Sequence, residues 1–168
     1  MKTVTAEVRY AEPEDASSLA SVHDAAWRNA YSGLIPYQSL NRMLERRDAA
    51  WWAQAIRNKA AILVLDFAGE TAGYATLGRN RTAALKVEGE VYELYLRPEY
   101  QGLGFGRRLF DAARDLLKSR GMRGVVVWAL ADNDAAVSFY TATGGIDVAE
   151  GQESFGGRPL RKVAFVWN

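Results

Sequence analysis

The stretch from Val91 to Leu117 constrains the fold more than any other part of the chain. It opens with β-branched, aromatic and aliphatic residues typical of a strand, and Pro98 then removes a backbone donor and ends that strand. Apolar residues recur at helical spacing towards the end of the stretch. Between them lie three alternating glycines, Gly102, Gly104 and Gly106. This order predicts an anion-binding site, because glycines let a ligand approach the backbone and the first N–H groups of a helix have no internal partner.

The spacing of these glycines excludes two common phosphate-binding loops. A dinucleotide-binding fingerprint needs a third glycine where this chain has Arg107 or Leu109, depending on where the count starts. A P-loop needs Lys and then Ser or Thr after its last glycine, and Gly106 is followed by two arginines. The pattern that fits is Gln/Arg-x-x-Gly-x-Gly/Ala, which is filled by Gln101, Gly104 and Gly106.

A second block further along the chain adds to this motif. Residues 133–144 read NDAAVSFYTATG and fit the pattern Asn-x-x-Ala-x-x-Phe-Tyr-x-x-x-Gly. Together the two blocks resemble the acetyl-CoA site of the GNAT superfamily of N-acetyltransferases. The resemblance is specific over residues 92–146 and holds elsewhere as an order of elements. The chain departs from the family pattern at Gly145, where relatives carry an aromatic residue.

Hydrophobic periodicity, caps and turn residues predict the other elements. Besides the strand before the glycine loop, strands are expected at residues 4–10, 61–67, 71–77, 125–130, 146–150 and 159–167. Ahead of the second strand, helices are expected from Pro13 to Gly33, from about Pro36, and over a segment 49–59 capped by Asp48. The predicted class is α/β (α+β), a GNAT-like mixed, mostly antiparallel sheet flanked by helices in the order β-α-α-β-β-β-α-β-α-β-β. The resemblance implies that its two central strands splay apart.

Composition sets broad limits on the protein. The chain has 168 residues, 49% of them hydrophobic, which suits a single domain over 1–168. Its 21 basic and 20 acidic residues indicate neither nucleic acid nor a membrane as partner. There is no cysteine, hence no thiolate metal site, and no metal is expected. No apolar run suits a signal peptide or a bilayer span, so a cytoplasmic location is expected. A homodimer remains open.

The resemblance divides this domain into functional parts and implies how acetyl-CoA is bound. The acceptor-side helices are expected in residues 1–60, the acetyl-CoA motif in 91–117 and the second motif in 133–146. In the family, the pantetheine arm bonds to the main chain of the strand before the glycine loop, and the pyrophosphate is bound by N–H groups of the loop. The cofactor-binding residues expected on this basis are Leu94, Tyr95, Leu96, Gln101, Gly102, Leu103, Gly104, Phe105, Gly106, Arg107, Asn133 and Phe139.

Acetyl transfer needs a base for the amine and an acid for the leaving thiolate. Tyr140 matches the family tyrosine that protonates the sulfur of coenzyme A; its alternative role is packing beside Phe139. Glu93 is the only acid in the strand 91–96 and is the candidate base; otherwise it is an exposed strand charge. His23 is more typical of a surface or core residue than of a catalyst.

The acceptor is less constrained. In the family the first helices form much of the acceptor wall, where Trp27 and Tyr31 lie in this chain. Relatives that acetylate protein N-termini carry a glutamate at the position of Trp128, which argues against that substrate class. Amino acids, polyamines, aminoglycoside-like compounds and peptide amines remain open.

The expected function is therefore transfer of an acetyl group from acetyl-CoA to a primary amine, on a small molecule or a peptide, by direct attack within a ternary complex. The alternative is an inactive coenzyme A-binding module with a regulatory role.

Overall fold

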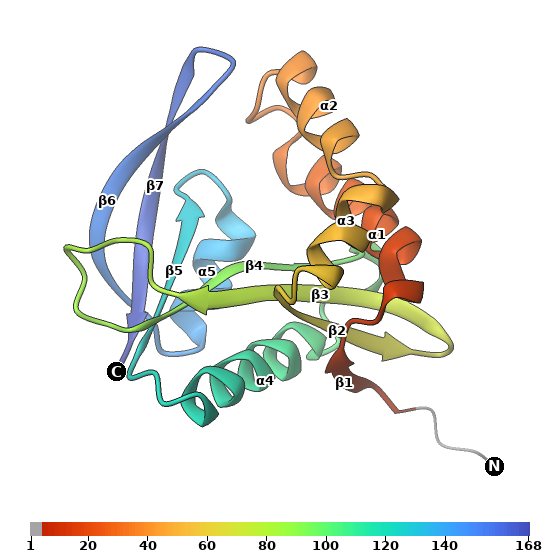
Figure 1. The fold of residues 1–168 in the computed structure, drawn as a ribbon. Helices are drawn as coiled ribbons and strands as arrows, with labels where there is room; N and C mark the ends of the chain where they lie inside the picture. Colours follow the sequence, from red (N-terminus) through yellow and green to blue (C-terminus); the bar gives the residue numbers. More distant parts are fainter. Residues whose placement is uncertain (1–4) are drawn as a thin grey trace.

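A computed structural model describes residues 5–168 of the chain. Seven strands form one sheet in the order β1-β2-β3-β4-β5-β7-β6, and every neighbouring pair is antiparallel except β4 and β5 (Figure 1). The strands are β1 Glu7–Tyr10, β2 Ala61–Phe67, β3 Glu70–Arg79, β4 Gly89–Leu96, β5 Val125–Leu130, β6 Ile146–Phe155 and β7 Arg158–Trp167. The helices are α1 Ala16–Tyr31, α2 Tyr37–Arg46, α3 Ala49–Arg57, α4 Phe105–Ser119 and α5 Asp134–Ala142.

This architecture confirms the predicted fold class, with one correction to the order of elements. Three helices lie between β1 and β2, as the three predicted helical segments indicate, whereas the summarised order of elements contained only two. The third forms because the side chain of Asp48 accepts a hydrogen bond from the backbone N–H of Trp51 at 2.9 Å and so starts a new helix directly after α2. The first strand was expected from Val4, which lies outside the described residues; β1 begins at Glu7.

The two central strands diverge from each other. β4 and β5 pair only at Gly89 with Val125 and at Glu90 with Val126, whereas β5 pairs with β7 along its whole length. Beyond Glu90 the edge of β4 that faces β5 therefore has no partner strand, and Figure 1 shows the two strands running apart. The predicted splay is thus confirmed, and it leaves backbone hydrogen-bonding groups free in the middle of the sheet.

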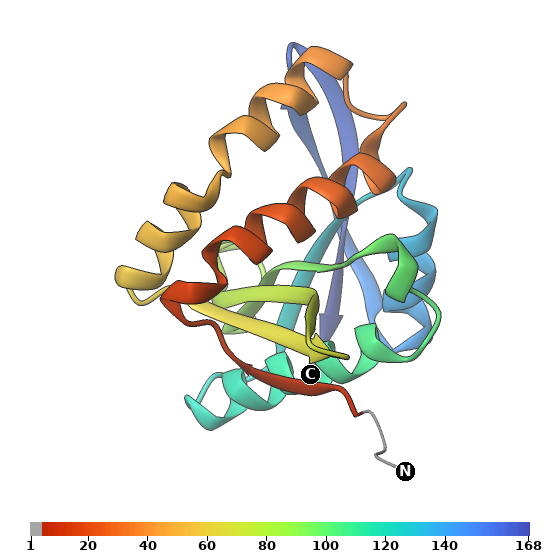
Figure 2. The ribbon, with the colours of Figure 1, turned by 90° about the vertical axis from the view of Figure 1, so that its right-hand side faces the viewer.

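Helices cover both faces of the sheet. Helix α1 packs on β3 and β4 from one side, and α4 packs on β2, β3 and β4 from the other. Figure 2 shows α1, α2 and α3 on the side of the sheet opposite to α4. Fully buried residues hold each layer, including Leu109 and Phe110 under the sheet and Trp52 above it. Across the described residues, no helix combines the length and the apolar character that a membrane crossing requires.

Candidate functional site

Two cavities lie next to each other around β4, and Tyr95 lines both of them. The first, here called the glycine-loop cavity, has a volume of about 510 Å³ and is formed by the end of β4, the glycine loop and the starts of α4 and α5. The second, the aromatic cavity, has a volume of about 390 Å³ and lies between α1, the α2–α3 connection, β4, β5 and the β6–β7 hairpin. Most residues singled out in the sequence line one cavity or the other.

The glycine loop has the geometry of an anion cradle. Gly102 and Gly104 adopt φ values of +79° and +80°, which favour glycine, and a Cβ at either position would meet no heavy atom within 4 Å. Among the described residues, the N–H groups of positions 102–107 donate to no backbone carbonyl, whereas that of Gln101 donates to Pro98 at 3.3 Å. These free donors at the start of α4 suit a phosphate, so the residues present fit the pyrophosphate of acetyl-CoA.

Most of the expected cofactor-binding residues line this cavity, but two do not. Leu103 is 57% exposed, and Phe105 is buried with its ring 4.8 Å from that of Phe67. Their side chains therefore do not line the cavity. The expected residues found in the cavity wall are Leu94, Tyr95, Leu96, Gln101, Gly102, Gly104, Gly106, Arg107, Asn133, Phe139 and Tyr140. The wall also contains residues that were not named individually as cofactor-binding: Ala26, Asn29 and Ala30 of α1, Asp132 before α5, and Asp134, Ala135 and Ala136 in the first turn of α5, within the second sequence block.

The second sequence block contributes α5 to this cavity. The Asn133 side chain accepts a hydrogen bond from the Ala136 backbone at 3.3 Å and caps the helix. Phe139 closes against the loop, since a Cβ at Gly106 would come within 3.4 Å of its ring. The two motifs, separate in sequence, thus line one cavity.

Tyr140 is buried, with 5% of its surface exposed, and lines the glycine-loop cavity. Its ring packs 5.8 Å from those of Phe110 and Trp167, as the packing alternative predicts. Its hydroxyl makes no hydrogen bond to any described residue. Burial, with a smaller contribution from Tyr31, raises the pKa of Tyr140 well above its ordinary value. The phenol therefore holds its proton at neutral pH.

Glu93 lines the aromatic cavity, and its side chain is 12% exposed. Leu94, the next residue along β4, lies in the wall of the other cavity. Three donors hold the carboxylate: Arg47 Nη1 at 3.1 Å, the Tyr74 hydroxyl at 3.1 Å and Thr76 Oγ1 at 3.2 Å. Glu93 is thus a positioned carboxylate at the cavity wall and not an exposed strand charge.

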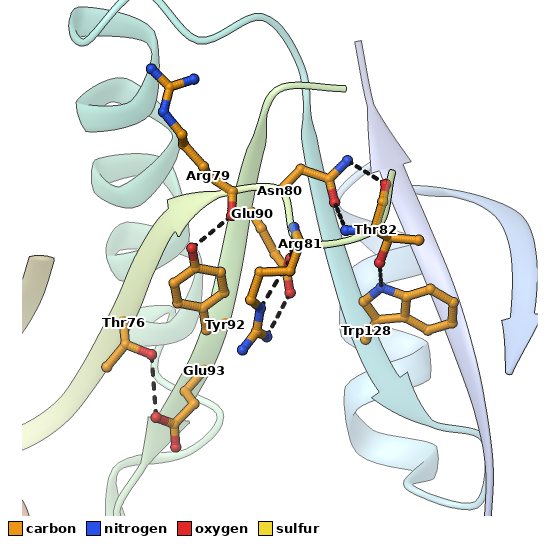
Figure 3. Close-up of polar contacts among 9 residues, drawn as sticks. All are labelled: Thr76, Arg79, Asn80, Arg81, Thr82, Glu90, Tyr92, Glu93 and Trp128. Carbon is orange, nitrogen blue, oxygen red and sulfur yellow. Dashed lines mark hydrogen bonds and ion pairs between the residues drawn. The ribbon is translucent and has the colours of Figure 1, made fainter. Parts of the chain in front are cut away.

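A second carboxylate, Glu90, was missed. Glu93 was predicted to be the only acid in this strand, which is wrong because β4 begins at Gly89 and includes Glu90. Only 1% of the Glu90 side chain is exposed, and Arg81 binds it through its backbone N–H at 2.9 Å and Nη2 at 2.8 Å (Figure 3). The sequence did offer a sign of Glu90, because this residue comes directly before the apolar run of a strand that borders the cleft.

A β-bulge explains why both carboxylates face one cavity. Val91 pairs with Leu77 and Glu93 pairs with Thr76, so Tyr92 is the extra residue on β4. Side chains alternate along a strand, and the extra residue shifts that alternation by one. Glu90 and Tyr92 before the shift, and Glu93 and Tyr95 after it, therefore all line the aromatic cavity.

The expected acceptor residues Trp27 and Tyr31 also line the aromatic cavity. The hydroxyls of Tyr31 and Tyr95 are hydrogen-bonded at 2.5 Å, next to the glycine-loop cavity, and burial raises the pKa of both phenols. Trp128 lines the opposite wall, where its Nε1 donates to Thr82 Oγ1 at 3.2 Å, as Figure 3 shows. Residues expected on the acceptor side and residues expected to bind the cofactor thus meet at this pair of tyrosines.

Comparison with known proteins agrees with this geometry. The model of the Acetyltransferase (GNAT) family matches residues 20–144. The chain is 30% identical over 161 residues to the uncharacterized N-acetyltransferase YuaI of Bacillus subtilis (strain 168), a match that covers 95% of this chain and 91% of that protein.

Solved structures share the fold. The paia N-acetyltransferase of Thermoplasma acidophilum, in complex with coenzyme A, is 18% identical with a TM-score of 0.71, over 94% of this chain and 98% of that one. The Salmonella typhimurium protein yncA, with its cofactor acetyl-CoA, is 19% identical with a TM-score of 0.69, over 99% of this chain and 94% of that one.

Proposed function

Because the chain belongs to the GNAT family of acetyltransferases and is an acyltransferase, we propose that it moves an acetyl group from acetyl-CoA to a primary amine by direct attack within a ternary complex. One observation carries this proposal. A cavity with an anion cradle and a cavity with a positioned carboxylate meet at Tyr95, so two substrates can be bound at once with their reacting ends adjacent.

The glycine-loop cavity holds acetyl-CoA in this proposal. The N–H groups at the start of α4 bind the pyrophosphate, and the partial positive charge of the helix N-terminus adds to the attraction. The free edge of β4 at Leu94, Tyr95 and Leu96 offers main-chain donors and acceptors to the pantetheine arm. Arg107 lines the same cavity and supplies a positive charge near the phosphates.

The aromatic cavity holds the amine. An alkyl ammonium has a pKa of ~10.4, so nearly all acceptor arrives protonated at neutral pH and must lose a proton before it can attack. Glu93 takes that proton, directly or through water. When bound, acetyl-CoA supplies the carbonyl carbon to which the amine nitrogen bonds and the sulfur that leaves as that C–S bond breaks. Tyr140, which keeps its proton at neutral pH, donates it to the sulfur, and the second proton that the nitrogen loses as the amide forms restores the phenol.

The alternative is a chain that binds coenzyme A without catalysis and acts in regulation. The two functions differ in turnover. Incubation of the protein with acetyl-CoA and a panel of amines, with free thiol measured over time, should show release of coenzyme A that depends on an amine. Calorimetry that shows binding of acetyl-CoA, together with no release above the blank for any amine, would favour the inactive module.

A further inference from the structure

The charged residues of the aromatic cavity indicate what kind of amine it accepts. The two carboxylates of its wall that are largely shielded from solvent already have an arginine partner: Glu90 is bound by Arg81 at 2.8 Å and Glu93 by Arg47 at 3.1 Å. The third acid, Glu153, is exposed at the rim. A polycation such as a polyamine or an aminoglycoside would therefore meet no buried carboxylate that lacks a counter-ion, and it would be repelled by the arginines.

The same wall offers positive charge to an anion. Lys162 lines the cavity and makes no ion pair with a described residue; its ammonium lies 4.7 Å from the ring centroid of Trp128. The Arg47 guanidinium makes one hydrogen bond within the described residues, to Glu93, and its other four N–H donors are free of protein acceptors. Its guanidinium stacks on Trp51 at 3.9 Å, which keeps the planar group in place. Arg47 is thus a positioned receptor for a carboxylate.

Arg47 and Glu93 together match a zwitterion. In an α-amino acid the ammonium and the carboxylate are attached to one carbon, so the two opposite charges lie side by side, as the guanidinium and the carboxylate do here. We propose, building on the function above, that the acceptor is a free α-amino acid with an apolar side chain, its carboxylate bound by Arg47 and its amine beside Glu93. The apolar side chain then packs on the remaining wall, which includes Ile35, Met43, Trp51 and Phe155.

A matched set of acceptors tests the proposal on the wild-type protein. L-phenylalanine, phenylalaninamide, a peptide with N-terminal phenylalanine and spermidine are compared by kcat/KM for release of coenzyme A. We expect L-phenylalanine to exceed the amide and the peptide by about 10-fold or more, the size of one charge-assisted hydrogen-bonded contact, and to exceed spermidine as well. The difference in amine pKa alone would favour the amide, because its amine loses its proton more readily than that of L-phenylalanine.

Variants of Arg47 test whether this residue causes the preference for the acid over the amide. Arg47→Met keeps an apolar chain over Trp51 and removes the guanidinium, so the ratio between L-phenylalanine and its amide should fall towards one while the affinity for acetyl-CoA is unchanged. Arg47→Lys should restore part of the ratio. Arg42→Met, an exposed arginine of the same helix region outside the cavity, should keep the wild-type ratio.

The outcomes separate this inference from the proposed function. Turnover that is equal for the acid and the amide, or highest with spermidine or the peptide, would overturn the inference and leave acetyl transfer intact. Absence of coenzyme A release with every amine would overturn the proposed function. In that case titration of tryptophan fluorescence still decides the inference: L-phenylalanine should quench it in wild type and not in Arg47→Met, and equal responses to the acid and the amide would contradict it.

Discussion

The carboxylate of Glu90 lies 2.8 Å from Nη2 of Arg81, and only 1% of the Glu90 side chain is exposed while 65% of the Arg81 side chain is. The arginine therefore neutralises, from the surface, a charge that the strand buries. This pair joins the β3–β4 loop to β4 at the wall of the aromatic cavity.

Removal of the arginine alone should cost stability. Arg81→Met leaves the buried charge without its ion-pair partner, so we expect the free energy of unfolding in urea to fall by about 3 kcal/mol. Arg81→Met/Glu90→Gln removes the charge as well and should recover most of that loss. A single variant as stable as wild type would show that water replaces the guanidinium without cost.

Two glycines with equal backbone geometry separate cofactor binding from stability. Gly104 and Gly121 both have φ +80° and open space around a built Cβ, but only Gly104 lies in the glycine-loop cavity. Gly104→Val and Gly121→Val should each lose about 1–2 kcal/mol of stability, the cost of a left-handed conformation. In calorimetry only Gly104→Val should lose affinity for coenzyme A. A folded Gly104→Val protein that binds coenzyme A with wild-type affinity would show that the glycine loop does not bind the cofactor.

Tyr140→Phe tests the proposed acid. The ring packing is preserved and only the proton is lost, so kcat should fall by roughly 10²- to 10⁴-fold with little change in the affinity for acetyl-CoA. Tyr37→Phe, a change at a hydroxyl on a 75% exposed residue, is the control and should have no effect. Wild-type kcat in Tyr140→Phe, measured where chemistry limits the rate, would leave this tyrosine a packing role.

Glu93→Gln tests the proposed base. The change keeps the shape and removes the basicity, so kcat/KM for the amine should fall and recover in part as the pH rises and more amine is free of its proton. Acetyl-CoA should bind as before. The control is Glu153→Gln, at the exposed rim of the same cavity. Superimposable pH–rate profiles for Glu93→Gln and wild type would mean that water or a backbone carbonyl is the base.

His23 should make stability depend on pH. It is 1% exposed, neither ring nitrogen has a hydrogen-bond partner among the described residues, and burial, with a smaller effect of Arg47, lowers its pKa to about 3. Between the unfolded pKa of ~6.5 and about 3 the unfolded chain binds the extra proton, so stability falls as the pH falls through that window.

The size of this effect can be measured against a variant that cannot titrate. At pH 5 the loss attributed to His23 is about 2 kcal/mol relative to neutral pH. Urea unfolding of wild type and His23→Phe at pH 7 and pH 5 gives the difference. If the two proteins lost the same stability between these pH values, carboxylates alone would account for the acid sensitivity.

Features determined by neighbouring residues could be predicted from the sequence. The glycine loop at the start of α4 and the Asp48 cap of α3 both depend on a few adjacent residues, and the structure has each of them. The two motifs also identified most of the wall of the glycine-loop cavity, because both are local patterns of residue type and spacing.

Other features depend on segments that are far apart in the chain. The ion pair between Arg47 and Glu93 joins residues 46 apart, and no local pattern marks it. The placement of Glu90 and Glu93 in one cavity follows from the bulge at Tyr92, which exists only where β4 pairs with β3. The burial of His23 likewise depends on rings from α1, α3 and β3 that meet around it.

The sequence by itself thus determined the family, the order of strand, loop and helix, and the anion cradle, since backbone donors at a helix start are set within one turn. The tertiary structure alone decided which charged groups line the aromatic cavity and how they are paired. Strand register and packing between distant segments set the partners of a carboxylate and the face of the sheet on which it lies. Such long-range contacts produce no periodic pattern in a single sequence, so they could not be predicted from it.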